Sequence, residues 1–113
     1  MKAGVYNNGI LAGIVEKRPD GTYSFEYDDV YLQNDKNPSI SLTLPRSTNK
    51  HESEKLFSFF FGLLAEGINK NIQCRLLKID ENDHFGRLLL TAQEDTIGSI
   101  TVKPLQDELS GLL

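Results

Sequence analysis

A chain of 113 residues is close to the usual size of one domain, and 39% hydrophobic with 25% charged residues is the composition of a folded globular protein. Its formal charge of −4, from 16 acidic against 12 basic residues, opposes direct binding to the phosphate backbone of nucleic acids. The one cysteine excludes an intramolecular disulfide, and no signal peptide or membrane-spanning stretch is recognisable, so we expect a cytoplasmic protein without membrane contact.

The first third of the chain predicts strands joined by tight turns. Two β-prone runs flank Asn8 and Gly9, a pair that tolerates the positive φ angles of a hairpin turn. The segment RPDGT is a second turn signal, because proline, aspartate and glycine each favour a turn position. In the run TYSFEY, aromatic and polar residues alternate with the period of a strand that has one buried face. We therefore predict three antiparallel strands.

A fourth strand is predicted after residues 28–38, which we expect to be irregular. Alternation places Ile40, Leu42 and Leu44 on one face of this strand. Pro45 cannot donate a ladder hydrogen bond, so the strand is expected to end there.

The apolar spacing then changes to that of helices. Ser53 is the expected N-cap of the first helix and Gly67 its expected stop. Asp83 is the expected cap of the third. The apolar faces of the three predicted helices are Leu56, Phe59, Phe60, Leu63 and Leu64; then Ile68, Ile72, Leu76 and Ile79; then Phe85, Leu88, Leu89 and Ala92.

Residues 97–104 return to strand character and complete the predicted fold. Hairpins followed by consecutive amphipathic helices are typical of an α+β domain. We expect an antiparallel sheet from the N-terminal hairpins, packed beside a group of about three helices, with one late strand. This domain would span residues 1–104, and residues 105–113 would form a short tail.

Metal sites are not favoured by the sequence. The segment 80–91 begins like a calcium loop, but Phe85 stands where glycine is required and Thr91 where a bidentate glutamate is required. A polar turn that leads into a helix is the better interpretation. His51 and His84 lack the spacing of zinc ligands, and we expect both at the surface.

Catalysis is not favoured either. The chain has no GxxxxGK[ST] loop, no GxGxxG turn and no HRD or DFG motif, so it has no visible means of holding nucleotide phosphates. Cys74 has no recognisable activating partner, and we favour a structural role for it. We predict no catalytic residue, cofactor or metal, although a small enzyme of an unfamiliar kind stays open as an alternative.

A phenylalanine-rich run leads to a polar corner. Phe57, Phe59 and Phe60 are expected to fill the core, because aromatic residues at helical spacing usually do so, whereas the place of Phe61 stays open. The corner AEGIN follows directly, and a loop held on a rigid domain is suited to contact a partner.

The order of motifs resembles a known family. The segments LTLP, FFFGLLAEG, DHFGRLLL and EDTIGSITVKP, between Leu42 and Pro104, are similar to the N-terminal subdomain 1 of HipA-type serine/threonine kinases. Ala65 replaces the usual proline of the corner, and Gln93 and Ser99 replace a glycine and an alanine of the later motif.

The resemblance implies a role beside a kinase. HipA-type kinases carry their ATP-binding and catalytic residues in later parts of a longer chain, and this chain is similar to HipS, the small stand-alone antitoxin of split toxin–antitoxin systems. The implied partners are a HipT-like kinase, which the protein would bind and inhibit, and through that complex a HipB-like helix-turn-helix protein. The alternative is a non-inhibitory assembly subunit that completes the kinase fold or links it to the repressor.

The corner supplies the expected partner-binding residues. Ile68 occupies the position where HipA-like sequences often have an aromatic residue, but it also begins the apolar stripe of the second predicted helix. Burial and partner contact therefore both stay open for it. The expected contact residues are Glu66, Gly67, Ile68, Asn69 and Asn71.

Overall fold

The computed structural model describes residues 1–64, 75, 78, 80, 82–91 and 100–105. An antiparallel sheet and short helices confirm the predicted α+β class. The strands are β1 (Lys2–Asn7), β2 (Ile10–Lys17), β3 (Tyr23–Tyr27), β4 (Lys50–Ser53) and β5 (Ile100–Pro104). The helices are α1 (Asp29–Gln33), α2 (Ser58–Phe61) and α4 (His84–Thr91).

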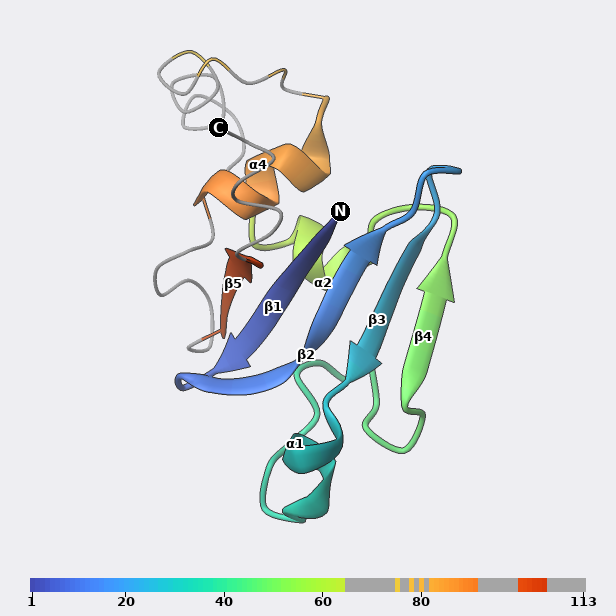
Figure 1. Ribbon diagram of the computed structural model, residues 1–113, viewed down its shortest axis with the longest axis vertical. Helices are drawn as coiled ribbons and strands as arrows, with labels where there is room; N and C mark the ends of the chain where they lie inside the picture. Colours follow the sequence, from blue (N-terminus) through green and yellow to red (C-terminus); the bar gives the residue numbers. More distant parts are fainter. Residues whose placement is uncertain (65–74, 76–77, 79, 81, 92–99, 106–113) are drawn as a thin grey trace.

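The five strands form one sheet in the order β4-β3-β2-β1-β5, and each neighbouring pair is antiparallel (Figure 1). The predicted late strand is confirmed as β5, which pairs with β1 although almost the whole chain separates them. Ala3 lies opposite Val15, and Val15 opposite Phe25, so these side chains share one face of the sheet. That face carries the core.

Both predicted turns are confirmed. Asn8 and Gly9 join β1 to β2 with φ angles of 52° and 80°, the left-handed region that a type I′ hairpin turn requires. Gly21 has a φ of 90° in the turn between β2 and β3. In the same turn Asp20 accepts hydrogen bonds from the backbone N–H of Thr22 at 2.9 Å and from its hydroxyl at 2.6 Å.

The core lies between the sheet and the helices α2 and α4. Phe25 is fully buried, and its ring centroid lies 5.8 Å from that of Phe60 on α2. From α4, three side chains join the same cluster, which confirms the apolar face predicted for this helix within the described residues. They are Phe85, Leu88 and Leu89.

One glycine allows this packing on the sheet side. A Cβ atom on Gly13 would lie 2.4 Å from the backbone oxygen of Glu26 and 2.7 Å from the Phe25 ring. Only the absence of a side chain therefore lets Phe25 cover β2 at this point. Next to it, the register of β1 and β2 shifts between Val5 and Tyr6, where β2 contains one extra residue, Ala12.

The predicted fourth strand is wrong in position. Ser41 and Leu44 form an isolated bridge around a tight turn whose tip, Leu42, is 99% exposed. Ile40 and Leu44 are buried because the Tyr27 hydroxyl accepts a hydrogen bond from the Ile40 N–H at 3.1 Å and donates one to the Leu44 carbonyl. These two alternating apolar residues therefore hold a turn in place and do not belong to a strand. The strand that pairs with β3 is β4, at residues 50–53.

The connection from β3 to β4 is also more regular than expected. Helix α1 begins after Asp28, whose carboxylate accepts hydrogen bonds from the N–H groups of Val30 at 3.1 Å and Tyr31 at 3.2 Å. The Arg46 guanidinium donates to backbone carbonyls of this connection, including that of Leu32 at 2.8 Å. The Asp28 cap and the Arg46 hydrogen bonds thus order a segment that the spacing of apolar residues does not mark as a helix. Figure 1 shows α1 at the end of the sheet away from α4.

The predicted first helix is shorter than expected. Ser53 does not cap it, because this residue ends β4 opposite Tyr23, and its hydroxyl accepts from the N–H of Lys55 at 3.2 Å. Helix α2 begins after Phe57 and has Gly62 as its C-cap. The predicted stop, Gly67, lies outside the described residues, as do most of the second predicted helix and residues 106–113.

No helix in the described ranges is both long and apolar enough to cross a membrane.

Candidate partner-binding site

The chain enters the predicted contact corner from a packed turn. Phe60 is fully buried and Leu64 is 6% exposed. The N–H groups of Leu63 and Leu64 donate to the carbonyls of Phe60 and Phe61, both at 3.1 Å. The start of the corner is therefore fixed to the core.

The corner residues lie outside the part of the chain that the structure describes, so their role in binding stays a prediction. They are Glu66, Gly67, Ile68, Asn69 and Asn71.

The phenylalanine run divides between the core and the surface. Phe60 is in the core, as predicted, whereas Phe57 and Phe59 are only partly buried and pack against it, with ring centroids 6.1 and 5.2 Å from that of Phe60. Phe61 is 39% exposed and meets the His84 ring edge-on at 4.9 Å. The sequence left Phe61 open, and the structure places it at the rim of a pocket.

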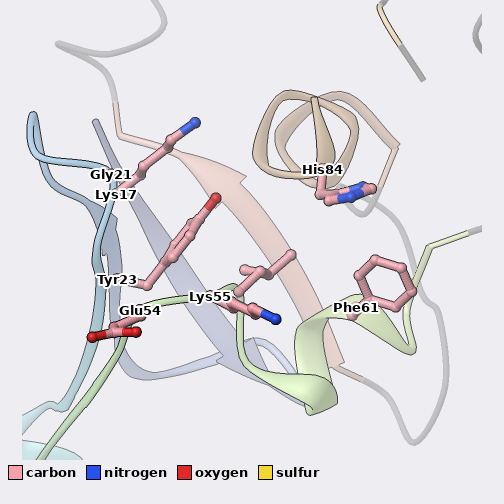
Figure 2. A pocket seen from close by; sticks show the side chains of 8 residues that line it. Lys17, Gly21, Tyr23, Glu54, Lys55, Phe61 and His84 are labelled. Carbon is pink, nitrogen blue, oxygen red and sulfur yellow. The ribbon is translucent and has the colours of Figure 1, made fainter. Parts of the chain in front are cut away.

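This pocket has a volume of about 430 Å³, within the range of about 300–1,000 Å³ that ligand sites usually have (Figure 2). Its walls come from the end of β2, the start of β3, the segment between β4 and α2, and the two helices α2 and α4. The lining residues are Lys17, Gly21, Tyr23, Glu54, Lys55, Leu56, Phe61 and His84.

Tyr23 forms the floor of the pocket. It is 8% exposed and its ring centroid lies 5.9 Å from that of Phe85. Figure 2 shows its hydroxyl pointing into the space between Lys17 and His84. Among the described residues this hydroxyl has no hydrogen-bond partner, and the same holds for the buried Nδ1 atom of His84.

The charges that line the pocket are mainly positive. The Lys17 ammonium lies 6.0 Å from the centroid of the Tyr23 ring. The Met1 nitrogen donates to the Lys17 carbonyl at 2.9 Å. Neither Lys17 nor Lys55 has an ion-pair partner within the described ranges, and Glu54 is the one acidic residue of the lining.

A neighbouring groove of about 480 Å³ has its polar groups paired. Arg18 and Glu52 form an ion pair at 3.1 Å, and the hydrogen bond that the Arg18 guanidinium donates to the Glu52 carboxylate raises the pKa of Arg18. The hydrogen bonds from Thr22 lower the pKa of Asp20. Because these groups satisfy one another, the groove is a weaker candidate than the pocket around Tyr23.

The segment that begins like a calcium loop forms a polar turn, as predicted. The Asp80 carboxylate accepts from the N–H of Asn82 at 2.8 Å, and the Asp83 carboxylate accepts from the N–H of Gly86 at 3.0 Å, at the start of α4. Within the described ranges no cluster of at least three potential metal ligands occurs.

The two histidines are more buried than the sequence predicted. His51 and His84 were both expected at the surface, but each is half-buried. The reason differs between them. His51 lies 3.1 Å from the Pro45 carbonyl through Nε2 and packs beside the Tyr27 ring, whereas His84 is covered by Phe61.

No local sequence pattern indicates the pocket. Its lining residues lie in segments that are far apart in the chain, and only the antiparallel pairing of β2, β3 and β4 and the docking of α4 bring them together. One sequence feature does point to it: the place of Phe61, in the core or at the surface, is left open, although Phe61 lies within an apolar run.

Comparisons with known proteins agree on one family. The family model described as the HipA N-terminal domain matches residues 3–103. A solved structure, described as the N-terminal domain of HipA toxin, superposes with a TM-score of 0.67 at 25% sequence identity, and the match covers 90% of each chain. A search of curated proteins found no match.

Proposed function

Because this chain belongs to the HipA N-terminal domain family, we propose that it is an antitoxin that binds and inhibits a separately encoded, HipT-like serine/threonine kinase. The observation that carries the proposal is the extent of the match, which reaches from residue 3 to residue 103 and covers 90% of the solved domain. A protein that has the fold of one part of a kinase toxin is suited to occupy the place of that part on a separate kinase.

The proposed mode of action is binding rather than catalysis. A rigid domain that holds an exposed loop can block or distort a cleft on its partner. Here α2 and Leu64 fix the entry to the corner. The contact would be made by Glu66, Gly67, Ile68, Asn69 and Asn71. We place the complex in the cytoplasm, and a HipB-like DNA-binding protein would join it through the kinase rather than through this chain.

A second function is favoured by the same comparison. The matched solved domain is named as part of the HipA toxin itself, so this chain could complete a kinase fold without inhibiting it. It would then be an assembly subunit that supports the kinase or links it to a repressor.

Phosphorylation by the purified kinase separates the two functions. The rate of phosphate transfer from ATP by a purified HipT-like kinase is measured with and without this protein. An antitoxin lowers the rate, whereas an assembly subunit leaves it unchanged or raises it. Co-expression adds a second readout, because an antitoxin restores the growth of cells that produce the kinase.

A further inference from the structure

We infer that the pocket around Tyr23 binds an acidic segment of a protein partner, namely an Asp or Glu side chain next to an apolar residue. The inference rests on the proposed function, since the partner is the kinase, and it adds a second contact to the predicted corner. The corner begins four residues after Phe61, which lines the pocket, so one partner surface can reach both.

The first argument is the state of the Tyr23 hydroxyl. Buried tyrosine hydroxyls usually have a hydrogen-bond partner. Tyr27 and Tyr31 follow this rule, because their hydroxyls donate to the carbonyls of Leu44 and Pro38. Tyr23 as a whole residue is 8% exposed, but its hydroxyl points into the pocket, is not among the fully buried polar atoms, and has no protein partner among the described residues. The hydroxyl is thus open to the pocket and can donate to an acceptor group of a bound segment.

The second argument is charge. Two cations close to the pocket, Arg18 and Lys50, lie within 4.0 Å of the Glu52 carboxylate. Lys17 and Lys55 have no such partner in the described part of the chain. In Figure 2, Glu54 lies at the edge of the pocket away from Phe61 and His84. An incoming carboxylate therefore meets the Lys55 ammonium, the Lys17 ammonium above the Tyr23 ring, and a hydroxyl donor.

The third argument is the apolar rim, which identifies the kind of ligand. Phe61 is 39% exposed, and Leu56 is half-buried beside the same space. A free inorganic anion would leave these side chains in water. A peptide segment satisfies both halves of the pocket, because its acidic side chain reaches the donors while its apolar neighbour covers Phe61.

The test is the affinity of the purified kinase for variants of this protein, measured by titration calorimetry. Tyr23→Phe removes only the hydroxyl, and Lys17→Glu with Lys55→Glu reverses both cations. Each change should weaken binding about tenfold or more, because the lost interaction is a charge-assisted hydrogen bond or a charge pair. The matched control is Lys36→Glu, an exposed lysine beyond α1 at the other end of the sheet, which should leave the affinity within about twofold.

The outcomes separate this inference from the proposed function. If the kinase binds all variants as tightly as the original protein, the function stands and the pocket inference is overturned. A drop for Lys36→Glu as large as for the pocket variants also overturns it, because net charge would then explain the effect. Melting temperatures of all variants are measured first, so that a misfolded variant is not counted as a loss of contact.

If the kinase does not bind the original protein, the proposed function fails and a second probe decides the pocket. The peptide acetyl-Leu-Glu-Glu-amide is titrated into the isotope-labelled protein and followed by NMR, with acetyl-Leu-Gln-Gln-amide and sodium phosphate as comparisons. Saturable shifts at Tyr23 and Lys55 with the glutamate peptide alone support the inference. Equal shifts with phosphate show a site for a small anion and overturn it, and so does the absence of shifts.

Discussion

Removal of one buried hydroxyl, in Tyr27→Phe, should cost a large part of the stability of the domain. The hydroxyl is the hydrogen-bond partner of both the Ile40 N–H and the Leu44 carbonyl, at the place where the connection from β3 to β4 closes over the sheet. Tyr27 is 2% exposed and Leu44 is also 2% exposed, so water cannot readily replace the lost group.

The size of the effect follows from the two groups that lose their partner. A buried donor or acceptor left unsatisfied costs about 1–3 kcal/mol, so the two together should lower the free energy of unfolding by about 3 kcal/mol. For a domain of this size that corresponds to a fall in melting temperature of roughly 12 °C. Urea and thermal unfolding, followed by circular dichroism, measure both quantities.

The matched control is Tyr6→Phe, which removes the same atom from a half-buried tyrosine on β1. No hydrogen bond to the Tyr6 hydroxyl occurs within the described ranges, so this change should stay within about 0.5 kcal/mol of the original protein. If Tyr27→Phe is as stable as Tyr6→Phe, the proposed closure of the connection by the Tyr27 hydroxyl is refuted.

Alkaline pH gives a second readout of the same hydroxyl. Burial raises the pKa of Tyr27 above its ordinary value of 10.0. The folded protein then holds the phenolic proton more tightly than the unfolded chain, so the stabilisation is fully present below about pH 10 and is lost as the pH rises through the folded pKa. The stability of Tyr27→Phe should therefore fall less steeply above pH 10 than that of the original protein.

Three further predictions concern other parts of the molecule. Ile68→Asp and Glu66→Lys should each weaken kinase inhibition without a change in melting temperature. For Ile68→Asp the loss should be about tenfold or more, as for a hot-spot contact, and full inhibition by both folded variants would exclude the corner as the binding site. Gly13→Ala should destabilise the domain by about 2 kcal/mol or more, because its Cβ would meet the Glu26 backbone oxygen at 2.4 Å, and an unchanged urea midpoint would contradict this packing. In an NMR titration, Asp20 should have a pKa below 3.8, and Thr22→Val should raise it towards that value; its stabilisation is present above the unfolded pKa and lost as the pH falls through the folded one.

Local signals predicted the first half of the sheet well. A type I′ turn needs positive φ at two adjacent residues, so Asn8 and Gly9 identify the hairpin without any tertiary information. The alternation of aromatic and polar residues in β3 is also a sufficient local signal, because one face of this strand is buried along its length. The capped helix α4 likewise begins where Asp83 predicts it.

The errors arose where tertiary contacts override local pattern. β4 is a short, polar edge strand, and such a sequence carries no strand signal before β3 is available to pair with it. Ile40 and Leu44 alternate like a strand, but the Tyr27 hydroxyl holds them in a turn. The helix predicted between the cap Ser53 and the stop Gly67 begins later, at Ser58, because Ser53 pairs with Tyr23 in the sheet.

The candidate site was predictable only in part. The corner could be identified through the resemblance of its motif to a family, and it stays a prediction. The pocket around Tyr23 could not, because residues such as Lys17 and His84 become neighbours only when the sheet and α4 have assembled. No sequence pattern links positions so far apart in the chain, and their chemistry became visible only from the free hydroxyl and the unpaired lysines.

The most direct test of the central claim compares kinase activity with the fraction of kinase that is bound. Increasing amounts of this protein are added to the purified HipT-like kinase, and phosphate transfer and complex formation are measured in the same samples. An antitoxin predicts that activity falls in proportion to the unbound kinase and approaches zero at saturation. A saturated complex that phosphorylates as fast as the free kinase, or faster, would contradict the account.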